Sequence, residues 1–210
     1  MPAAPVRALT PAQRRRLLVL ALLCAAVFAA AAATVSAHGL FGVELSVQQR
    51  VQASRGPKLE RLMRTATLLG SGGVLVAVSA AACVALWRRR RPLALAVATI
   101  AVSGYAAADL AKLITIRQRP NTVMYAFPSS HTFGIVIFLG VLAYLLWALE
   151  APPAARRVAV AIAAAVVVAV GYSRIYLNAH WLGDVVGGLA GGGAFVVVAV
   201  LLTDRRLRAG

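Results

Sequence analysis

Long apolar stretches separated by short polar segments dominate this sequence. About 20 apolar residues in an α-helix cross the hydrocarbon core of a bilayer. Six stretches approach or reach this length, and the pattern therefore predicts an all-α integral membrane protein, a bundle of six transmembrane helices. The expected spans are Leu17–Ala37, Ala66–Trp87, Leu93–Ala111, Thr132–Leu149, Val158–Tyr172 and Val185–Thr203. The fifth is the shortest, and its pattern allows continuation into Ile175 and Tyr176.

Composition supports a membrane protein. Of the 210 residues, 61% are hydrophobic and 13% are charged, and the mean hydropathy is +0.81. A soluble domain of this size would not normally show these values. The chain has no repeat, flexible linker or low-complexity tail, so we expect a single domain over residues 1–210 with an N-terminal tail over residues 1–16.

Two segments outside the regular pattern need their own interpretation. The first span ends in Val35-Ser36-Ala37, which resembles a signal peptidase site, but a run of 21 residues is longer than a typical signal core and favours a retained helix. The one sizeable loop covers residues 39–65. Within it Leu59, Leu62 and Met63 recur at helical spacing, which predicts a short interfacial helix leading into the second span.

Basic residues between the spans set the expected orientation. Lys and Arg accumulate in the short cytoplasmic loops of membrane proteins. Four arginine groups fall on the same side of a six-span bundle: Arg7 with Arg14–Arg16, Arg88–Arg91, Arg156–Arg157, and Arg205 with Arg206 and Arg208. We therefore expect a multi-pass protein of the cell (inner or plasma) membrane, with both termini cytoplasmic.

The formal net charge of +16 raises the question of a nucleic-acid partner. The arginine groups flank spans in short turns and form no continuous stripe between aromatic residues, so no nucleic-acid partner is expected. Anionic head groups of membrane lipids are sufficient partners for these charges.

Three short polar stretches, 112–120, 128–131 and 173–184, hold nearly all of the reactive side chains. Ionisable residues at the ends of membrane helices usually mark a functional site. The stretches lie in the connections between spans three and four and between spans five and six. In a six-span bundle with cytoplasmic termini, both connections are extracytoplasmic, and we expect one site on that face.

The cations of these stretches suggest an anionic ligand. Lys112, Arg119 and Arg174 have only Asp109 and Asp184 as nearby acids, and Arg matches the geometry of a phosphate. The alternative is that each cation reaches lipid phosphates as a plain anchor. Asp109, one turn before Lys112, either pairs with it or remains a solvated or cavity-facing acid.

The sequence Pro128-Ser129-Ser130-His131 directly precedes the fourth span. Pro and Ser at a helix start leave backbone N–H groups and the helix dipole available for an anion. The same sequence is also a common cap without any ligand. His131 favours a functional reading, because an imidazole rarely begins a span without a use.

His180 and Asp184 are four residues apart where the sixth span begins. If that turn is helical, the two side chains share one face. A carboxylate that holds one ring N–H leaves the other nitrogen as a base or nucleophile; a structural contact is equally consistent with the spacing. Two imidazoles combined with three cations form a set suited to phosphoryl transfer.

The segments Lys112-x6-Arg119-Pro120, Pro128-Ser129-Ser130-His131 and Ser173-Arg174-x5-His180-x3-Asp184 together resemble the three-part signature of the type 2 phosphatidic acid phosphatase (PAP2) superfamily. The order, the internal spacing and the six-span layout agree from the third span onward. The chain departs from the signature at Ser130, where the family usually has Gly, and a side chain there could slightly impair the backbone's approach to phosphate.

This resemblance implies a metal-independent phosphatase without a cofactor. His180 would attack phosphorus and form a phosphohistidine, Asp184 would orient it, and His131 would protonate the leaving oxygen and later help to activate water. The phosphate-binding groups that the resemblance implies are Lys112, Arg119, Arg174, Ser129 and the backbone N–H groups of Ser130 and His131.

A membrane-embedded site favours a lipid phosphate substrate, whose tail stays in the bilayer. We expect a polyprenyl diphosphate such as undecaprenyl diphosphate, then phosphatidylglycerophosphate or phosphatidic acid. Two alternatives remain: a lipid phosphotransferase that uses the same phosphohistidine, and a non-enzymatic transporter or binding protein for anionic lipids. The second would not require His180 and Asp184.

Residues outside the matched positions are expected to have lesser roles. His38, Glu44 and Glu60 have the pattern of ordinary loop residues, and Arg117 is a candidate contact for a lipid head group. Small-xxx-small spacing predicts close packing of the sixth helix at glycines 187, 188, 191, 192 and 193.

Overall fold

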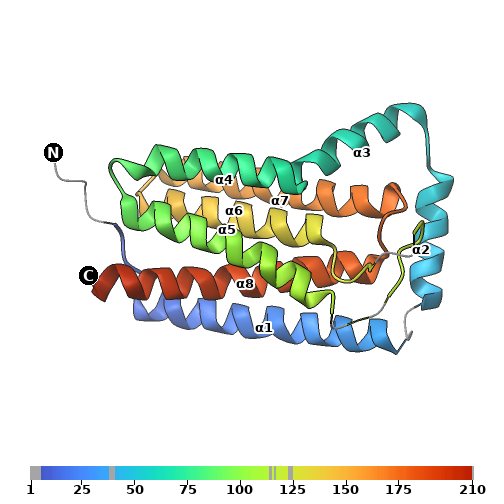
Figure 1. The fold of residues 1–210 in the computed structure, drawn as a ribbon, viewed down its shortest axis with the longest axis horizontal. Helices are drawn as coiled ribbons and strands as arrows, with labels where there is room; N and C mark the ends of the chain where they lie inside the picture. The colour runs from blue at the N-terminus through green and yellow to red at the C-terminus, as the bar shows by residue number, and fades with distance from the viewer. Residues whose placement is uncertain (1–5, 38–40, 114, 116, 123–124, 210) are drawn as a thin grey trace.

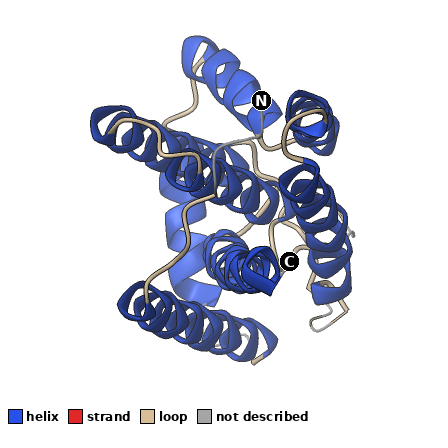
Figure 2. Ribbon diagram, turned by 90° about the vertical axis from the view of Figure 1, so that its left-hand side faces the viewer, coloured by secondary structure: helices blue, strands red, loops and turns tan. Residues whose placement is uncertain are grey.

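The computed structural model describes residues 6–37, 41–113, 115, 117–122 and 125–209. In this part of the chain all regular structure is helical and no strand is formed (Figures 1 and 2). The helices are α1 (Pro11–Ser36), α2 (Phe41–Ala53), α3 (Pro57–Leu69), α4 (Gly72–Trp87), α5 (Arg91–Ala111), α6 (Ser130–Ala148), α7 (Pro153–Tyr176) and α8 (Leu182–Ala209).

The predicted all-α membrane bundle is confirmed. Helices α1, α5, α6, α7 and α8 are each long and apolar enough to cross a bilayer. Helices α3 and α4 meet the same test together as a pair bent by 45°, which brings the spans to six when the pair is counted as one. Large apolar side chains such as Leu22, Val84 and Val102 are 69–74% exposed on the outside of the bundle, as a surface covered by lipid requires.

The second span begins later than the sequence pattern predicts. Ala66, its expected first residue, belongs to α3, and α4 starts only at Gly72. The Ser71 hydroxyl donates to the Leu68 carbonyl and helps to close α3. Gly70 packs at the bend, where an added Cβ would lie 3.0 Å from the carbonyl oxygen of His131. The bend therefore lies against the start of α6.

The segment over residues 39–65, expected to be mainly a loop, is largely helical. Helix α2 crosses one end of the bundle, and α3 returns from it towards α4 (Figure 1). The short helix predicted before the second span is confirmed as α3, which Pro57 begins at a position where proline costs no hydrogen bond.

Helix α8 packs closely on its neighbours α1 and α6. An added Cβ on Gly188 would lie 2.8 Å from the carbonyl oxygen of Ser129, and one on Gly192 would lie 2.7 Å from that of Phe133. Only glycine permits backbones to approach this closely, so the predicted small-residue packing is confirmed. This packing brings the start of α6 against the first turns of α8. Cys24 and Cys83, in α1 and α4, are free thiols.

Candidate active site

The three reactive stretches meet at the end of the bundle that α2 crosses (Figure 1). Residues 112–120 follow α5, residues 128–131 lead into α6, and residues 173–184 join α7 to α8. The backbone of Ser129 donates to the carbonyl oxygen of Asp184 at 2.9 Å, which ties the second stretch to the third. The structure therefore places the three stretches together, as the topology predicts.

His180 and Asp184 form a buried pair. His180 is 1% exposed and Asp184 is 0% exposed. The Nδ1 atom of His180 lies 3.4 Å from Oδ2 of Asp184. This distance is within ion-pair range, although Nδ1 forms no well-aligned hydrogen bond with the described residues. Catalytic hydrogen bonds often shorten only when substrate binds.

The backbone around this pair fixes its geometry. The Trp181 N–H donates to Asp184 Oδ2 at 2.8 Å, so the carboxylate caps the first turn of α8. The N–H groups of Ala179 and His180 both donate to the Arg174 carbonyl, at 3.0 and 3.1 Å, and fold the turn after α7. These bonds hold His180 just outside α8 and within reach of Asp184.

Burial sets the charge state of His180. Loss of solvent lowers the pKa of His180 below its ordinary value of 6.5, because the charged imidazolium is disfavoured in a buried site. Asp184 opposes this shift, whereas Arg174 and Arg119 add to it. The net result favours a neutral imidazole at neutral pH, which is the nucleophilic form.

The start of α6 presents hydrogen-bond donors at the site. Ser129 is fully buried and caps the helix, with its Oγ accepting from the Thr132 N–H. The next residues, Ser130 and His131, lie in the first turn, where backbone N–H groups have no partner within the helix. The Oγ of Ser130 is buried and has no hydrogen-bond partner among the described residues.

The three predicted cations lie within electrostatic range of the imidazoles. Arg174 is 9% exposed; its Nη1 donates to Thr67 Oγ1 at 2.7 Å, and its buried Nε has no partner among the described residues. The charges of Arg174, Arg119 and Lys112 all act on His131, and the first two also act on His180. Each of the three predicted cations therefore acts electrostatically on at least one of the two histidines.

Two of these cations have partners of their own. Lys112 Nζ lies 3.0 Å from Oδ1 of Asp109, which confirms the pairing that the sequence left open. Arg119 Nε donates to the carbonyl of Tyr125 at 3.2 Å, so this side chain braces the loop before α6. Both contacts leave guanidinium or ammonium donors available to a ligand.

Two charged residues beside the candidate site differ from what the sequence predicted. Glu44, expected to be an ordinary loop residue, lies in α2 and is 4% exposed. Arg117, expected to contact a lipid head group, is instead committed to two carboxylates: it pairs with Glu44 and lies 3.3 Å from Asp184. Glu60, also expected to be an ordinary loop residue, lies in the first turn of α3, where it pairs with Arg55 and Arg64. His38 lies outside the described residues.

The sequence did contain a signal for Glu44. Glu44, Gln48 and Gln52 follow one another at four-residue spacing, which places them on one face of a helix. Gln48 and Glu44 are buried polar residues, and buried polar residues need hydrogen-bond partners. A polar stripe of this kind indicates a helix face turned towards other polar groups.

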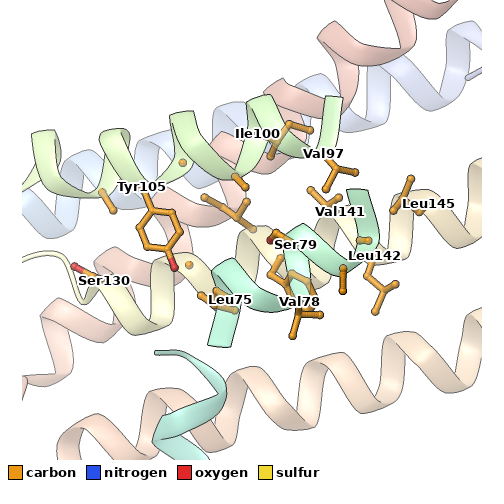
Figure 3. Close-up of a pocket in the computed structure, with 18 of the residues that line it drawn as sticks. Leu75, Val78, Ser79, Val97, Ile100, Tyr105, Ser130, Val141, Leu142 and Leu145 are labelled. Carbon is orange, nitrogen blue, oxygen red and sulfur yellow. The ribbon is translucent and has the colours of Figure 1, made fainter. Parts of the chain in front are cut away.

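An apolar cavity extends from the start of α6 between α4, α5 and α6. Its volume is about 370 Å³. Figure 3 shows Ser130 and Tyr105 towards one end and Leu145 at the other, with aliphatic side chains between them. Val78, Tyr105 and Leu142 are 37–42% exposed on its rim, so the cavity opens to the outside of the bundle.

Comparisons with known proteins bear on the fold and on the sequence from residue 115 onward. The family model of the PAP2 superfamily matches residues 115–208. Among solved structures, a PAP2-type phosphatidylglycerolphosphate phosphatase from Bacillus subtilis superposes with a TM-score of 0.79 and 22% identity, covering 86% of this chain and 94% of its own. Aquifex aeolicus LpxE gives a TM-score of 0.55 and 21% identity, with 76% and 93% covered.

A comparison with curated proteins gives no significant match. The two structural likenesses show the fold, and the family match covers the segment that contains Arg119, Ser129–His131, Arg174, His180 and Asp184. Residues 115–208 thus match the PAP2 superfamily, and the chain shares the fold of these two membrane phosphatases.

Proposed function

We propose that the protein is a metal-independent lipid phosphatase that hydrolyses a phosphomonoester or diphosphate through a phosphohistidine at His180. The observation that carries this proposal is the buried pair of His180 and Asp184, close to Arg174 and Arg119 and beside the first turn of α6. A carboxylate on one ring nitrogen prepares the other for attack, and the cations and N–H groups stabilise the negative charge of the phosphoryl group.

In the first step, Nε2 of His180 attacks phosphorus. A P–N bond forms while the bond from phosphorus to the leaving oxygen breaks, and the proton on Nδ1 stays with the imidazolium facing Asp184. His131 gives a proton to the leaving oxygen.

In the second step, water attacks the phosphohistidine. His131 accepts a proton from the water as the new P–O bond forms and the P–N bond breaks. Inorganic phosphate leaves, and the neutral imidazole of His180 is restored. The phosphate-binding role falls to Lys112, Arg119, Arg174, Ser129 and the backbone at Ser130.

The apolar cavity supports a lipid as the substrate. Its polar end includes Ser130, the neighbour of His131, and its length is lined by aliphatic side chains of α4, α5 and α6 (Figure 3). A lipid chain in this cavity would place its phosphate near the two histidines while the remaining chain stays in the bilayer. We expect a polyprenyl diphosphate as the best substrate, then phosphatidylglycerophosphate, the substrate named for the Bacillus subtilis protein, or phosphatidic acid.

Phosphate release by purified protein tests this function. Polyprenyl diphosphate, phosphatidylglycerophosphate and phosphatidic acid are supplied in detergent micelles with EDTA and without an added acceptor. Wild-type protein should release inorganic phosphate, and His180→Ala should lower the rate at least about 10³-fold. Turnover lost on chelation would contradict the metal-independent mechanism. Phosphate release only when an acceptor is added would indicate a transferase, and lipid binding without turnover would indicate a binding protein.

We further propose that the site faces the extracytoplasmic side and that the termini are cytoplasmic. Asn121, an exposed residue of the loop between α5 and α6, reports on this orientation. In a Cys24→Ala/Cys83→Ala background, Asn121→Cys should react with an impermeant thiol reagent added to intact cells. Labelling only after the membrane is opened would reverse the proposed orientation.

A further inference from the structure

A chain of alternating charges leads from α2 to the nucleophile. Glu44, Arg117 and Asp184 have side chains that are 5%, 11% and 0% exposed. Arg117 Nη2 pairs with Glu44 Oε2, while Nη1 donates to Glu44 Oε1 at 3.1 Å and to Asp184 Oδ1 at 3.3 Å. None of these contacts is used by the phosphatase mechanism described above.

The carboxylate of Asp184 is held on both of its oxygens. Oδ2 accepts the Trp181 N–H and faces His180, whereas Oδ1 accepts from Arg117. A fully buried carboxylate needs a compensating charge, which a neutral imidazole does not provide. Arg117 supplies that charge. It therefore balances the charge of the Asp184 carboxylate and fixes the oxygen that faces His180.

Glu44 holds Arg117 in this position. Its Oε1 also accepts the backbone N–H of Gly183 at 2.8 Å, so the carboxylate bridges Arg117 and the residue before Asp184. The guanidinium carbon of Arg117 lies 5.5 Å from the centre of the Trp181 ring, which limits its movement on another side. Glu44 also balances the positive charge of Arg117. Without this balance, Arg117 would compete with His180 for the Asp184 carboxylate.

The rest of the polar face of α2 contacts the same turn. Gln48 Nε2 donates to the Ile175 carbonyl at 3.0 Å and to Asn178 Oδ1 at 2.6 Å. Gln52 Nε2 donates to the carbonyls of Ile175 and Tyr176, both at 3.1 Å. These contacts, one and two helical turns beyond Glu44, fix α2 to the end of α7 just before His180. They support the same role independently of the charge chain.

We propose that Glu44 and Arg117 are positioning residues through which α2 holds Asp184, and with it His180, in the geometry for attack. This inference rests on the proposed role of His180 as nucleophile. The pair acts on the rate of phosphoryl transfer and does not bind the substrate. Its loss should therefore lower kcat and leave KM nearly unchanged.

Three variants test this inference. Arg117→Met removes the cation, Glu44→Gln removes one charge while keeping the side-chain shape, and Gly183→Ala adds a Cβ 2.6 Å from Glu44 Oε1 without removing any charge. We expect kcat to fall about 10- to 100-fold in Arg117→Met and about fivefold or more in the other two, with KM changing less than about threefold. Single-turnover trapping of phosphohistidine should be slowed by the same factor.

Glu60→Gln is the matched control. Glu60 also pairs with two arginines, but on the exposed surface of α3, and its loss should leave kcat unchanged. Arg117→Met leaves two buried carboxylates without their cation, so this substitution is also combined with Glu44→Gln. The double variant should lower kcat no more than Arg117→Met alone does, since the two residues act as a unit.

The outcomes separate this inference from the proposed function. If wild-type protein turns over, His180→Ala is inactive, and Glu44→Gln and Gly183→Ala keep the kcat of Glu60→Gln, the positioning role is wrong while the phosphatase stands. Equal losses in kcat and apparent affinity would also overturn it, because they indicate a damaged substrate site. An inactive wild type, or an active His180→Ala, would instead reject the proposed function.

Discussion

Helix α8 has a buried aspartate near each end, and the two have closely similar surroundings. Asp184 and Asp204 have side chains that are 0% and 2% exposed. Each accepts a backbone N–H at 2.8 Å, from Trp181 and from Leu9 respectively. Each also faces an arginine, at 3.3 Å for Asp184 and 2.6 Å for Asp204. Burial of a carboxylate thus requires the same compensation at both ends of the helix.

The two aspartates differ in what they connect. Arg14 donates to Asp204 through both Nε and Nη2, and the Leu9 N–H belongs to the same N-terminal segment, so this carboxylate fastens the beginning of the chain to its last helix. Asp184 shares its arginine with Glu44 and directs its other oxygen towards His180. A buried aspartate–arginine pair is therefore structural by default. The neighbouring imidazole is what distinguishes Asp184 and makes it a candidate for the reactive site.

The largest expected difference between the two is in turnover. Asp184→Asn should lower kcat for phosphate release about 10²–10⁴-fold, because an amide neither orients the imidazole nor stabilises its positive form. Asp204→Asn, at the other end of the same helix, should keep kcat within about threefold. Rates are measured on purified protein and referred to the folded fraction. An Asp184→Asn enzyme with half of the wild-type turnover would contradict the assignment.

The bundle and the position of the site follow from the sequence for simple reasons. Apolar length determines which segments cross a bilayer, and the alternation of spans determines which connections share a face. Those two rules place Lys112, His131 and His180 at one end without any information on packing. Spacing also predicts the contact between His180 and Asp184, but His180 lies outside α8, and the contact forms through a turn in which Asp184 caps the helix by accepting the Trp181 N–H.

The sequence is less informative about α2 and about the break before α4. Polar residues are normally assigned to a solvated face, yet in α2 the polar face with Glu44 is buried, while Val43 is 56% exposed. At a membrane surface the usual rule can invert, because lipid receives the apolar face. Averaged hydropathy likewise does not reveal the bend at Gly70, where the chain packs against His131, a residue far along the sequence.

Arg14 shows a further limit of sequence patterns. Its place among Arg14–Arg16 indicates a topology anchor, and the structure adds an ion pair with Asp204 across 190 positions. Asp204 in turn is followed by Arg205 and Arg206, so in the sequence it is a single acid within a basic cluster. No local pattern distinguishes an arginine that faces lipid phosphates from one that compensates a buried acid, because the partner is set by packing.

The second prediction concerns stability. Asp204→Ala should lower the free energy of unfolding by about 2–3 kcal/mol, because it removes an acceptor for the Leu9 N–H and leaves Arg14 without its carboxylate. This loss of stability is smaller than that expected for a fully buried ion pair, since the Arg14 side chain is 30% exposed. Denaturant unfolding in detergent measures the change. Glu60→Ala, which removes ion pairs at the surface, should lower the free energy of unfolding by less than about 1 kcal/mol. Equal losses of stability in the two variants would contradict the proposed role of Asp204 in holding the N-terminal segment to α8.

The smallest expected effect is on the pH dependence of kcat/KM. Burial lowers the pKa of His180 below 6.5, and the neutral form persists above that pKa, so the acid limb of the wild-type profile should lie below pH 6.5. Asp184 raises this pKa, while Arg174 and Arg119 lower it further. Removing the carboxylate in Asp184→Asn therefore leaves only the lowering influences, and the acid limb should move to still lower pH even though the rate falls.

Asp204→Asn provides the matched control for this profile. Asp204 lies 20 positions from Asp184, about 30 Å along the helix, and its charge is compensated locally by Arg14. Its removal should leave the acid limb in place. Because substrate ionisation is common to all three proteins, it cancels in the comparison between them. An acid limb that moves upwards in Asp184→Asn, or that moves equally in both variants, would mean that the limb does not report on His180 and its partner.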